Sequence, residues 1–244
     1  MKKFSIKKLV PEQKKLRKRI LELSYESNFS HIGSCLSAVD LIDAVYETKK
    51  RNEKFVLSNG HAGIAWYSVL EKYGYFKSPN IIKKLNIHPD RNVKFDIHVS
   101  TGSLGQGLPI ALGMALADRK KNVYCMLSDG ECTEGSIWEA LRVAKEKKVH
   151  NLKIIINANG WGAYDKVNLA NLIKRIKGFG YAVNTVDGHD SKKILNLLKK
   201  TSDKKLAILF AYTFVEQFPF LKGQDAHYYI LKQKDYEEAV KSLI

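Results

Sequence analysis

The fold is decided by residues 123–160, which read VYCMLSDGECTEGSIWEALRVAKEKKVHNLKIIINANG. Apolar residues at 123–127 are followed by the polar turn 128–130, which is the pattern of a short buried strand that ends in a loop. Residues 133–147 then have helical character, and a second apolar run at 152–156 ends in a turn at 157–160. The stretch therefore predicts a strand, a helix and a second strand.

The same alternation continues on both sides of this stretch. Short apolar runs predict further strands at 55–57, 181–186 and 206–211, and helical spacing predicts helices at 11–26, 37–48, 62–73 and 108–119. Strands that alternate with helices indicate an α/β fold with a mostly parallel sheet and helices on both faces. With 244 residues and 45% hydrophobic content, the chain has enough core for one domain, residues 1–244.

Lysine and arginine outnumber the acidic residues by 41 to 25, which gives the chain a formal net charge of +16. Such a charge attracts nucleic acid, anionic lipid or phosphorylated metabolites. The lysines are scattered in short runs among apolar positions. We therefore interpret them as solvated helix faces and do not expect nucleic-acid binding.

Three cysteines, Cys35, Cys125 and Cys132, form no CxxC pair, so the sequence indicates neither a disulfide framework nor a zinc site. The N-terminus has no apolar run of signal-peptide length, and no stretch reaches the roughly 18 apolar residues of a membrane span. We therefore expect a cytoplasmic protein that does not enter a membrane.

Asp129 and Asn159 each lie just past a predicted buried strand, separated by a turn, a helix and a strand. Because ligands of parallel sheets bind beyond the carboxyl ends of the strands, both side chains are expected at one edge. A carboxylate and an amide oxygen beside a backbone carbonyl suit a hard cation such as Mg²⁺. Gly130 allows a diphosphate to approach the backbone, and the following helix offers its positive end. Taken singly, Asp129 also fits a helix cap and Asn159 a turn residue.

The segment from Leu127 to Leu141, followed by Asn159, resembles the thiamine-diphosphate signature of transketolases, in which Asp-Gly precedes an Asn by about thirty residues. Further motifs stand in the order expected of a transketolase amino-terminal domain: SHIGS (30–34), SNGHA (58–62), HP (88–89), TGSLGQG (101–107) and DGHD (187–190). The resemblance covers residues 10–200 and is weaker beyond. Several motifs in one order rarely arise by chance, so the resemblance extends to the thiamine-diphosphate-binding fold.

The resemblance implies that Asp129, Asn159 and the backbone carbonyl of Trp161 bind the metal, which is Mg²⁺ or, in its place, Ca²⁺ or Mn²⁺. Gly130 would contact the diphosphate of thiamine diphosphate. The aminopyrimidine would pack against a glycine-rich loop that also admits a neighbouring chain, formed by Gly102, Ser103 and Leu104.

The resemblance also implies the catalytic residues. His61 would contact the diphosphate and face the substrate carbonyl. His31 and His88 would line the channel to the thiazolium carbon, where an imidazole can move protons near neutral pH. Glu134 would join a carboxylate network across the dimer interface.

In this family a glutamate from a second, pyrimidine-binding domain activates the cofactor, and the family pattern continues for several hundred residues beyond this chain. The chain therefore resembles the amino-terminal subunit of a split transketolase that needs a separate carboxy-terminal subunit, in an α2β2 heterotetramer. The resemblance implies transfer of a two-carbon ketol unit from a ketose to an aldose in carbohydrate metabolism, with sugars or sugar phosphates as substrates.

Three departures from the family pattern bear on the substrate. Asn157 stands where an acidic residue is more common, 160–164 replaces a more aliphatic segment, and 212–220 is aromatic where the family is rich in Lys and Gly. A specialised sugar substrate is the resulting hypothesis.

Three residues match the family less specifically. His227 matches a late family histidine at the mouth of the active site, whereas Asp187 and His189 fit the family pattern and also a structural role in a turn.

Two other functions remain open. A decarboxylase or a deoxyxylulose-phosphate-synthase-like enzyme shares the Asp-Gly and Asn signature, but is not expected to combine SNGH with GSLGQG in this form. A non-catalytic assembly protein would need only the fold and the basic charge. Loss of function should remove metal ligands first, however, and Asp129 and Asn159 are both present.

Overall fold

Five parallel strands form the centre of the computed structural model, which describes residues 4–162, 165–200 and 207–244. In the order of the sheet they are β1 (Lys54–Leu57), β2 (Val123–Ser128), β3 (Leu152–Ala158), β5 (Ala207–Tyr212) and β4 (Ala182–Asp187). All four pairings are parallel. The expected parallel sheet is therefore confirmed, including the neighbouring places of the two strands that precede Asp129 and Asn159.

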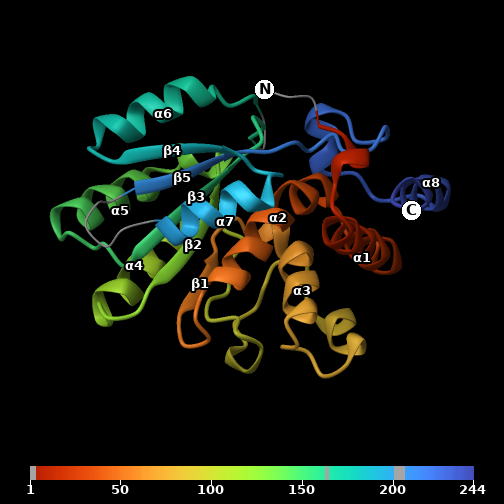
Figure 1. Cartoon of the computed structure of the whole chain (residues 1–244), viewed down its shortest axis with the longest axis horizontal. Helices are drawn as coiled ribbons and strands as arrows, with labels where there is room; N and C mark the ends of the chain where they lie inside the picture. The colour runs from red at the N-terminus through yellow and green to blue at the C-terminus, as the bar shows by residue number, and fades with distance from the viewer. Residues whose placement is uncertain (1–3, 163–164, 201–206) are drawn as a thin grey trace.

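Helices cover both faces of the sheet and enclose two hydrophobic cores, as Figure 1 shows. The first core lies under α1 (Pro11–Ser27), α2 (Ile32–Thr48), α3 (Gly63–Lys72), α7 (Ser191–Lys200) and α8 (Gln233–Ser242). The second lies under α4 (Gly107–Ala117), α5 (Gly135–Glu146) and α6 (Leu169–Gly178). Strand β2 serves both, because alternate side chains of a strand point to opposite faces.

Short 3-10 helices lie between these elements or before the first of them. They are η1 (Ile6–Lys8), η2 (Gly60–Ala62), η3 (Pro79–Lys84), η4 (Val93–Phe95), η5 (Gly130–Thr133) and η6 (Gly223–His227). Two of them, η2 and η5, follow β1 and β2 directly and carry His61 and Gly130. The carboxyl ends of the strands therefore collect the motifs that the sequence singled out.

Helix α2 begins at Ile32, five residues before the predicted start. His31 precedes it with a left-handed backbone (φ 63°), and the Cys35 N–H already bonds to the His31 carbonyl oxygen at 3.0 Å. A Cβ atom on Gly33 would lie 2.9 Å from the Cβ of Ala226. Tertiary packing against the C-terminal part of the chain therefore extends this helix through residues whose composition reads as a break.

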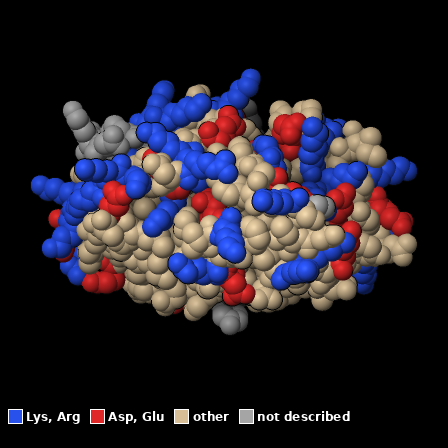
Figure 2. Space-filling model, turned by 90° about the horizontal axis from the view of Figure 1, so that it is seen from below, with Lys and Arg blue, Asp and Glu red and all other residues tan. Residues whose placement is uncertain are grey.

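The surface charge is distributed over many elements. Figure 2 shows Lys and Arg side chains spread over one face, with acidic and neutral residues between them. Many are paired, as in the contacts of Arg142 with Glu139 and Glu146. Among the described residues no helix is both long and apolar enough to cross a bilayer.

Candidate functional site

Asp129 and Asn159 lie at the same corner of the sheet, as expected. Strand β2 pairs with β3 so that Ser128 lies opposite Asn157, and each loop leaves the sheet immediately afterwards. Asp129 is completely buried, and its Oδ2 accepts a hydrogen bond from the Gly160 N–H at 2.7 Å. The Asn159 Oδ1 accepts one from the Trp161 N–H at 2.9 Å. These bonds fold the loop after β3 back onto the loop after β2.

The carbonyl oxygen of Trp161 faces the same corner. A Cβ atom placed on Gly130 would lie 3.3 Å from this oxygen and 2.8 Å from the Cα of Gly162. The two loops are thus in contact at Gly130, where only glycine fits. A carboxylate, an amide oxygen and a backbone carbonyl oxygen come together here, which is an all-oxygen set suited to a hard divalent cation.

Burial raises the pKa of Asp129 to about 7. Hydrogen bonds from backbone N–H groups oppose this rise, and the bond from the Gly160 N–H has the largest opposing effect. Its Oδ1 atom is buried without a hydrogen-bond partner. In the described residues, no group of three or more His, Cys, Asp or Glu side chains is arranged to hold a metal. A cation at this corner would therefore use the mixed oxygen set, and it fits the unpartnered carboxylate oxygen.

Four histidine rings meet beside this corner. The ring centroid of His31 lies 5.4 Å from that of His61, 5.9 Å from that of His88 and 6.1 Å from that of His227. They come from the start of α2, from η2, from the loop after η3 and from η6. The structure thus brings the three predicted histidines together with His227.

Burial favours the neutral form of three of these rings, those of His31, His61 and His227. Burial, followed by repulsion from the neighbouring histidines, lowers the pKa of His61 to about 3 and that of His31 to about 4. Burial also lowers the pKa of His227. A neutral imidazole carries one hydrogen-bond donor and one acceptor, so the cluster is suited to binding a polar ligand.

The glycine-rich loop packs between two of the motifs. Gly102 has a φ of 143°, and a Cβ atom there would lie 2.8 Å from the His88 ring. A Cβ atom on Gly60 would lie 2.6 Å from the Gly102 nitrogen. Ser103 is exposed, and Leu104 lines a cavity of about 320 Å³ that also borders Gly130. This close packing fixes the loop beside the Asp129 corner.

Of the two acidic residues that follow Asp129, the structure buries the one that sequence reasoning did not select. Glu131 is fully buried, and its Oε1 accepts hydrogen bonds from the Ser58 hydroxyl at 2.5 Å and the Gly105 N–H at 2.8 Å. Burial raises the pKa of Glu131 to about 7. Glu134 is exposed, so its role in a network with a second chain stays a prediction.

Unpartnered buried polar atoms gather at this site. Apart from Ser24 and His150, the described side chains with such atoms are His31, Asn59, Thr101, Asp129, Glu131 and His227. Buried polar atoms without a partner cost free energy, so a cluster of them indicates a place for a polar ligand. Asn59 and Thr101 were not singled out from the sequence. The sequence signal for these two residues was that they stand in the same motifs as His61 and Gly102.

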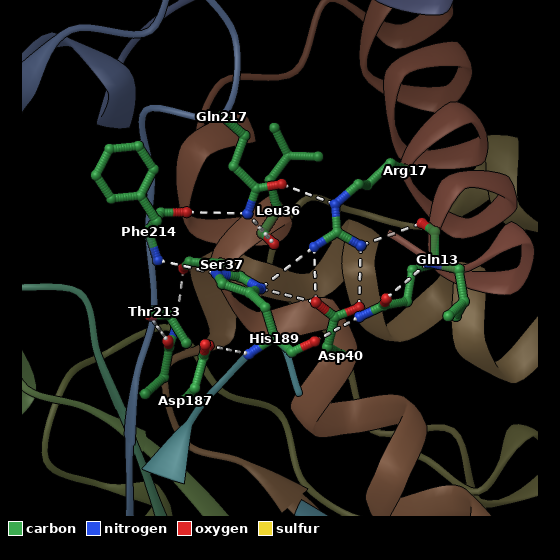
Figure 3. Close-up of polar contacts among 12 residues, drawn as sticks. Gln13, Arg17, Leu36, Ser37, Asp40, Asp187, His189, Thr213, Phe214 and Gln217 are labelled. Carbon is green, nitrogen blue, oxygen red and sulfur yellow. Dashed lines mark hydrogen bonds and ion pairs between the residues drawn. The ribbon is translucent and has the colours of Figure 1, made fainter. Parts of the chain in front are cut away.

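Asp187 and His189 lie away from the histidine cluster. The His189 N–H donates to Asp187 Oδ1 at 3.0 Å, a contact of the kind that a structural role in the turn after β4 would use. The His189 ring bonds to Asp40 at 2.8 Å, beside Arg17 (Figure 3). Of the divergent segment 160–164, residues 163 and 164 lie outside the described part of the chain.

Comparison with known proteins gives one consistent result. A family model described as the thiamine diphosphate binding domain of transketolase matches residues 22–242. The transketolase of Pongo abelii is 32% identical over 225 residues, which cover 82% of this chain and 36% of that protein. The chain thus spans little more than a third of the length of this relative.

A second kind of relative matches along its whole length. One subunit of the apulose-4-phosphate transketolase of Phocaeicola vulgatus is 30% identical, and the alignment covers 98% of this chain and 95% of that protein. Among solved structures, the transketolase of Campylobacter jejuni superposes with a TM-score of 0.83 and 26% identity, over 96% of this chain and 42% of that one.

Proposed function

The chain belongs to the family of transketolase thiamine-diphosphate-binding domains, and from this membership we propose that it is the cofactor-holding subunit of a two-chain transketolase. The observation that carries the proposal is the buried, unpartnered Asp129 Oδ1 atom, next to Gly130, whose Cβ position would lie 3.3 Å from the Trp161 carbonyl oxygen. Asp129, Asn159 and the Trp161 carbonyl would hold Mg²⁺, or Ca²⁺ or Mn²⁺ in its place. The diphosphate would lie against Gly130, where any side chain would intrude.

The remaining residues would orient the cofactor and the substrate. Gly102, Ser103 and Leu104 would border the aminopyrimidine, and Asn59 and Thr101 have unpartnered polar atoms for a ligand. His31, His61, His88 and His227 would hold and move protons at the substrate. When bound, thiamine diphosphate supplies the carbanion stabilisation that transfer of a two-carbon ketol unit requires.

A separate carboxy-terminal subunit completes the proposed enzyme. The relative that matches along its whole length is itself named as one subunit of a transketolase, and this chain has the same extent. The proposed assembly contains two chains of each kind. Each chain described here would form one domain of residues 1–244, and its exposed Glu134 would face a neighbouring chain. Sugars or sugar phosphates are the proposed substrates. Three buried free thiols support the reducing cytoplasm as the compartment.

Calorimetry tests the metal assignment. We expect thiamine diphosphate with Mg²⁺ to bind the complex of this chain with its carboxy-terminal subunit. Loss of a residue that only hydrogen-bonds to a metal ligand weakens binding by roughly 10–100-fold, and Asp129→Ala should weaken it by more than that. Asp118→Ala removes an exposed carboxylate that pairs with Lys121 and should leave the affinity unchanged. Equal affinity of the Asp129→Ala and wild-type complexes would refute the metal site.

A further inference from the structure

The loop from Thr213 to His227 connects the end of β5 to the histidine cluster. In space it lies beside helix α2. At its end, the His31 N–H donates to the His227 carbonyl oxygen at 2.8 Å, and Ala226 packs on Gly33. The Ser34 hydroxyl lies 3.3 Å from His227 Nε2. The position of the His227 ring therefore depends on how the loop docks on α2.

Gln217 fastens the first part of this loop. The side chain is 4% exposed, and its Nε2 donates to the carbonyl oxygens of Leu36 and Phe214, both at 2.9 Å. Its Oε1 accepts from Arg17 Nε at 2.7 Å. Figure 3 shows the amide of Gln217 between Arg17, Leu36 and Phe214. One neutral side chain thus joins the loop to both α1 and α2.

The anchor on the other side of Gln217 is a buried ion pair. Arg17 and Asp40 have fully buried side chains and form a bidentate contact, with N–O distances of 2.9 and 2.6 Å. Although burial by itself would raise the pKa of Asp40, the Arg17 guanidinium holds it well below its usual range. Bidentate charged pairs have restricted geometry, so Arg17 presents its Nε to Gln217 in a fixed direction.

His189 provides a second tie to the same loop. Its Nε2 accepts the Phe214 N–H at 3.1 Å, which leaves Nδ1 to donate to Asp40 Oδ2 at 2.8 Å. Thr213 donates from its hydroxyl to Asn157 Oδ1 at 2.5 Å. The first residues of the loop, 213–217, are therefore hydrogen-bonded to α1, α2, β3 and the turn after β4.

We propose that Gln217 is a positioning residue that docks the loop 213–227 on α1 and α2 and thereby sets the place of His227 among the four histidines. The catalytic part of this inference rests on the proposed function. The segment also carries Gly223, whose Cβ position would lie 3.2 Å from the Trp161 ring. Docking of the loop thus bears on the residue whose carbonyl oxygen faces the Asp129 corner.

Amide hydrogen exchange on the full chain, read by mass spectrometry, tests the docking. Gln217→Met keeps a long unbranched side chain and removes both donors and the acceptor. We expect exchange in peptides covering 213–231 to become about tenfold faster, since several buried hydrogen bonds are lost, with no change in β2. Gln233→Met is the matched control, because Gln233 bonds only to Glu237 on the exposed face of α8 among the contacts described.

The His227 imidazole reports on positioning. With ¹³C-labelled histidine, its resonance is assigned by loss in a His227→Gln variant, and its pKa is followed by pH titration in wild type and Gln217→Met. The groups that face this ring are His31, His61, Tyr228 and the Ser34 hydroxyl. Displacement of the loop should expose the ring and bring its lowered pKa back toward the ordinary histidine value of about 6.5.

Two results overturn the inference: unchanged exchange in 213–231, or faster exchange with an unchanged His227 titration. If Gln217→Met does not fold, Gln217→Glu carries the test, because it keeps the acceptor for Arg17 and removes the two donors. It should loosen the loop in the same way. Both measurements use this chain without cofactor. Failure of thiamine diphosphate to bind the complex would therefore refute the proposed function and leave the docking of the loop to be decided separately.

Discussion

His31 and His61 stay neutral at pH values where a free histidine is protonated. Burial and mutual repulsion lower their pKa values to about 4 and about 3, whereas an unfolded histidine titrates near about 6.5. Below that value the unfolded chain binds more protons than the folded one. Their contribution to stability is therefore complete above pH 6.5 and is lost as the pH falls toward 4.

We expect the free energy of unfolding to drop by about 1 kcal/mol per ring between pH 7 and pH 5, less than the full shift allows, because both rings are partly exposed. Urea denaturation at each pH measures this drop. His61→Gln should reduce it, and Gln233→Met, which changes an exposed residue outside the cluster, should not. An equal pH dependence in all three proteins would contradict the assignment of these pKa values.

Glu131 and Glu134 offer a matched pair of acidic residues three positions apart. Glu131→Ala removes the acceptor of the Ser58 hydroxyl and the Gly105 N–H in a fully buried place. We expect a loss of about 2–3 kcal/mol in the free energy of unfolding. Glu134→Ala changes an exposed side chain and should cost under about 0.5 kcal/mol. Chemical denaturation compares them, and equal losses would show that the buried contacts are not formed.

The sequence predicted part of this site and missed another part for a physical reason. Asp129 and Gly130 were indicated by their places just past a buried strand, and the three histidines by the resemblance of their motifs to the family pattern. Glu131 and Asn59 stand inside the same motifs, but only burial distinguishes them from surface polar residues. Burial depends on how β1, β2 and the glycine-rich loop pack together, which no local pattern contains.

At the level of elements, the first residue of α4 packs against Ser58, the residue directly after β1. A Cβ atom on Gly107 would lie 2.4 Å from Ser58 Oγ and 2.6 Å from Ser58 Cα, whereas one on Gly113 would have nothing within 4 Å. We expect Gly107→Ala to destabilise the chain by about 1–3 kcal/mol through overpacking. Gly113→Ala, in the same helix, should stabilise it by up to about 1 kcal/mol through helix propensity.

Thermal denaturation monitored by circular dichroism distinguishes these two variants. Shifts of opposite sign are the expected result. If Gly113→Ala lowers the melting temperature of the isolated chain, residue 113 makes a contact that the structure does not show. If Gly107→Ala leaves the melting temperature unchanged, α4 can move away from Ser58 without cost.

The five strands, including the largely exposed β4, and helices α1 to α5 were predicted from the sequence, whereas three later helices were missed. Strands β1, β2 and β3 were recognisable because nearly every side chain in them is buried. Helices α6, α7 and α8 were not identified, since each buries only one or two side chains among many lysines and acids. Through these few side chains α6 and α7 pack on β4, whereas α8 packs on α1.

At the scale of the whole molecule, the fold places one polar site between two apolar cores. Each core lies on one face of the sheet, and the strands that separate them end together at the loops that hold Asp129 and His61. Helix α2 links this edge to the rest of the chain, because it begins directly after His31 and contains Asp40. The site is therefore as rigid as the packing of α2 against the sheet.

The net charge of +16 leads to a prediction about the whole surface. Lys and Arg are interspersed with acidic residues rather than gathered in a stripe (Figure 2). Such a surface should contact about two or three phosphates of duplex DNA, so affinity should fall about 10–40-fold between 50 and 200 mM salt. Fluorescence anisotropy with two unrelated duplexes measures the slope and should find no sequence preference. A slope corresponding to six or more phosphates, or a strong preference for one duplex, would indicate a dedicated nucleic-acid surface and contradict the interpretation of the lysines as solvated helix faces.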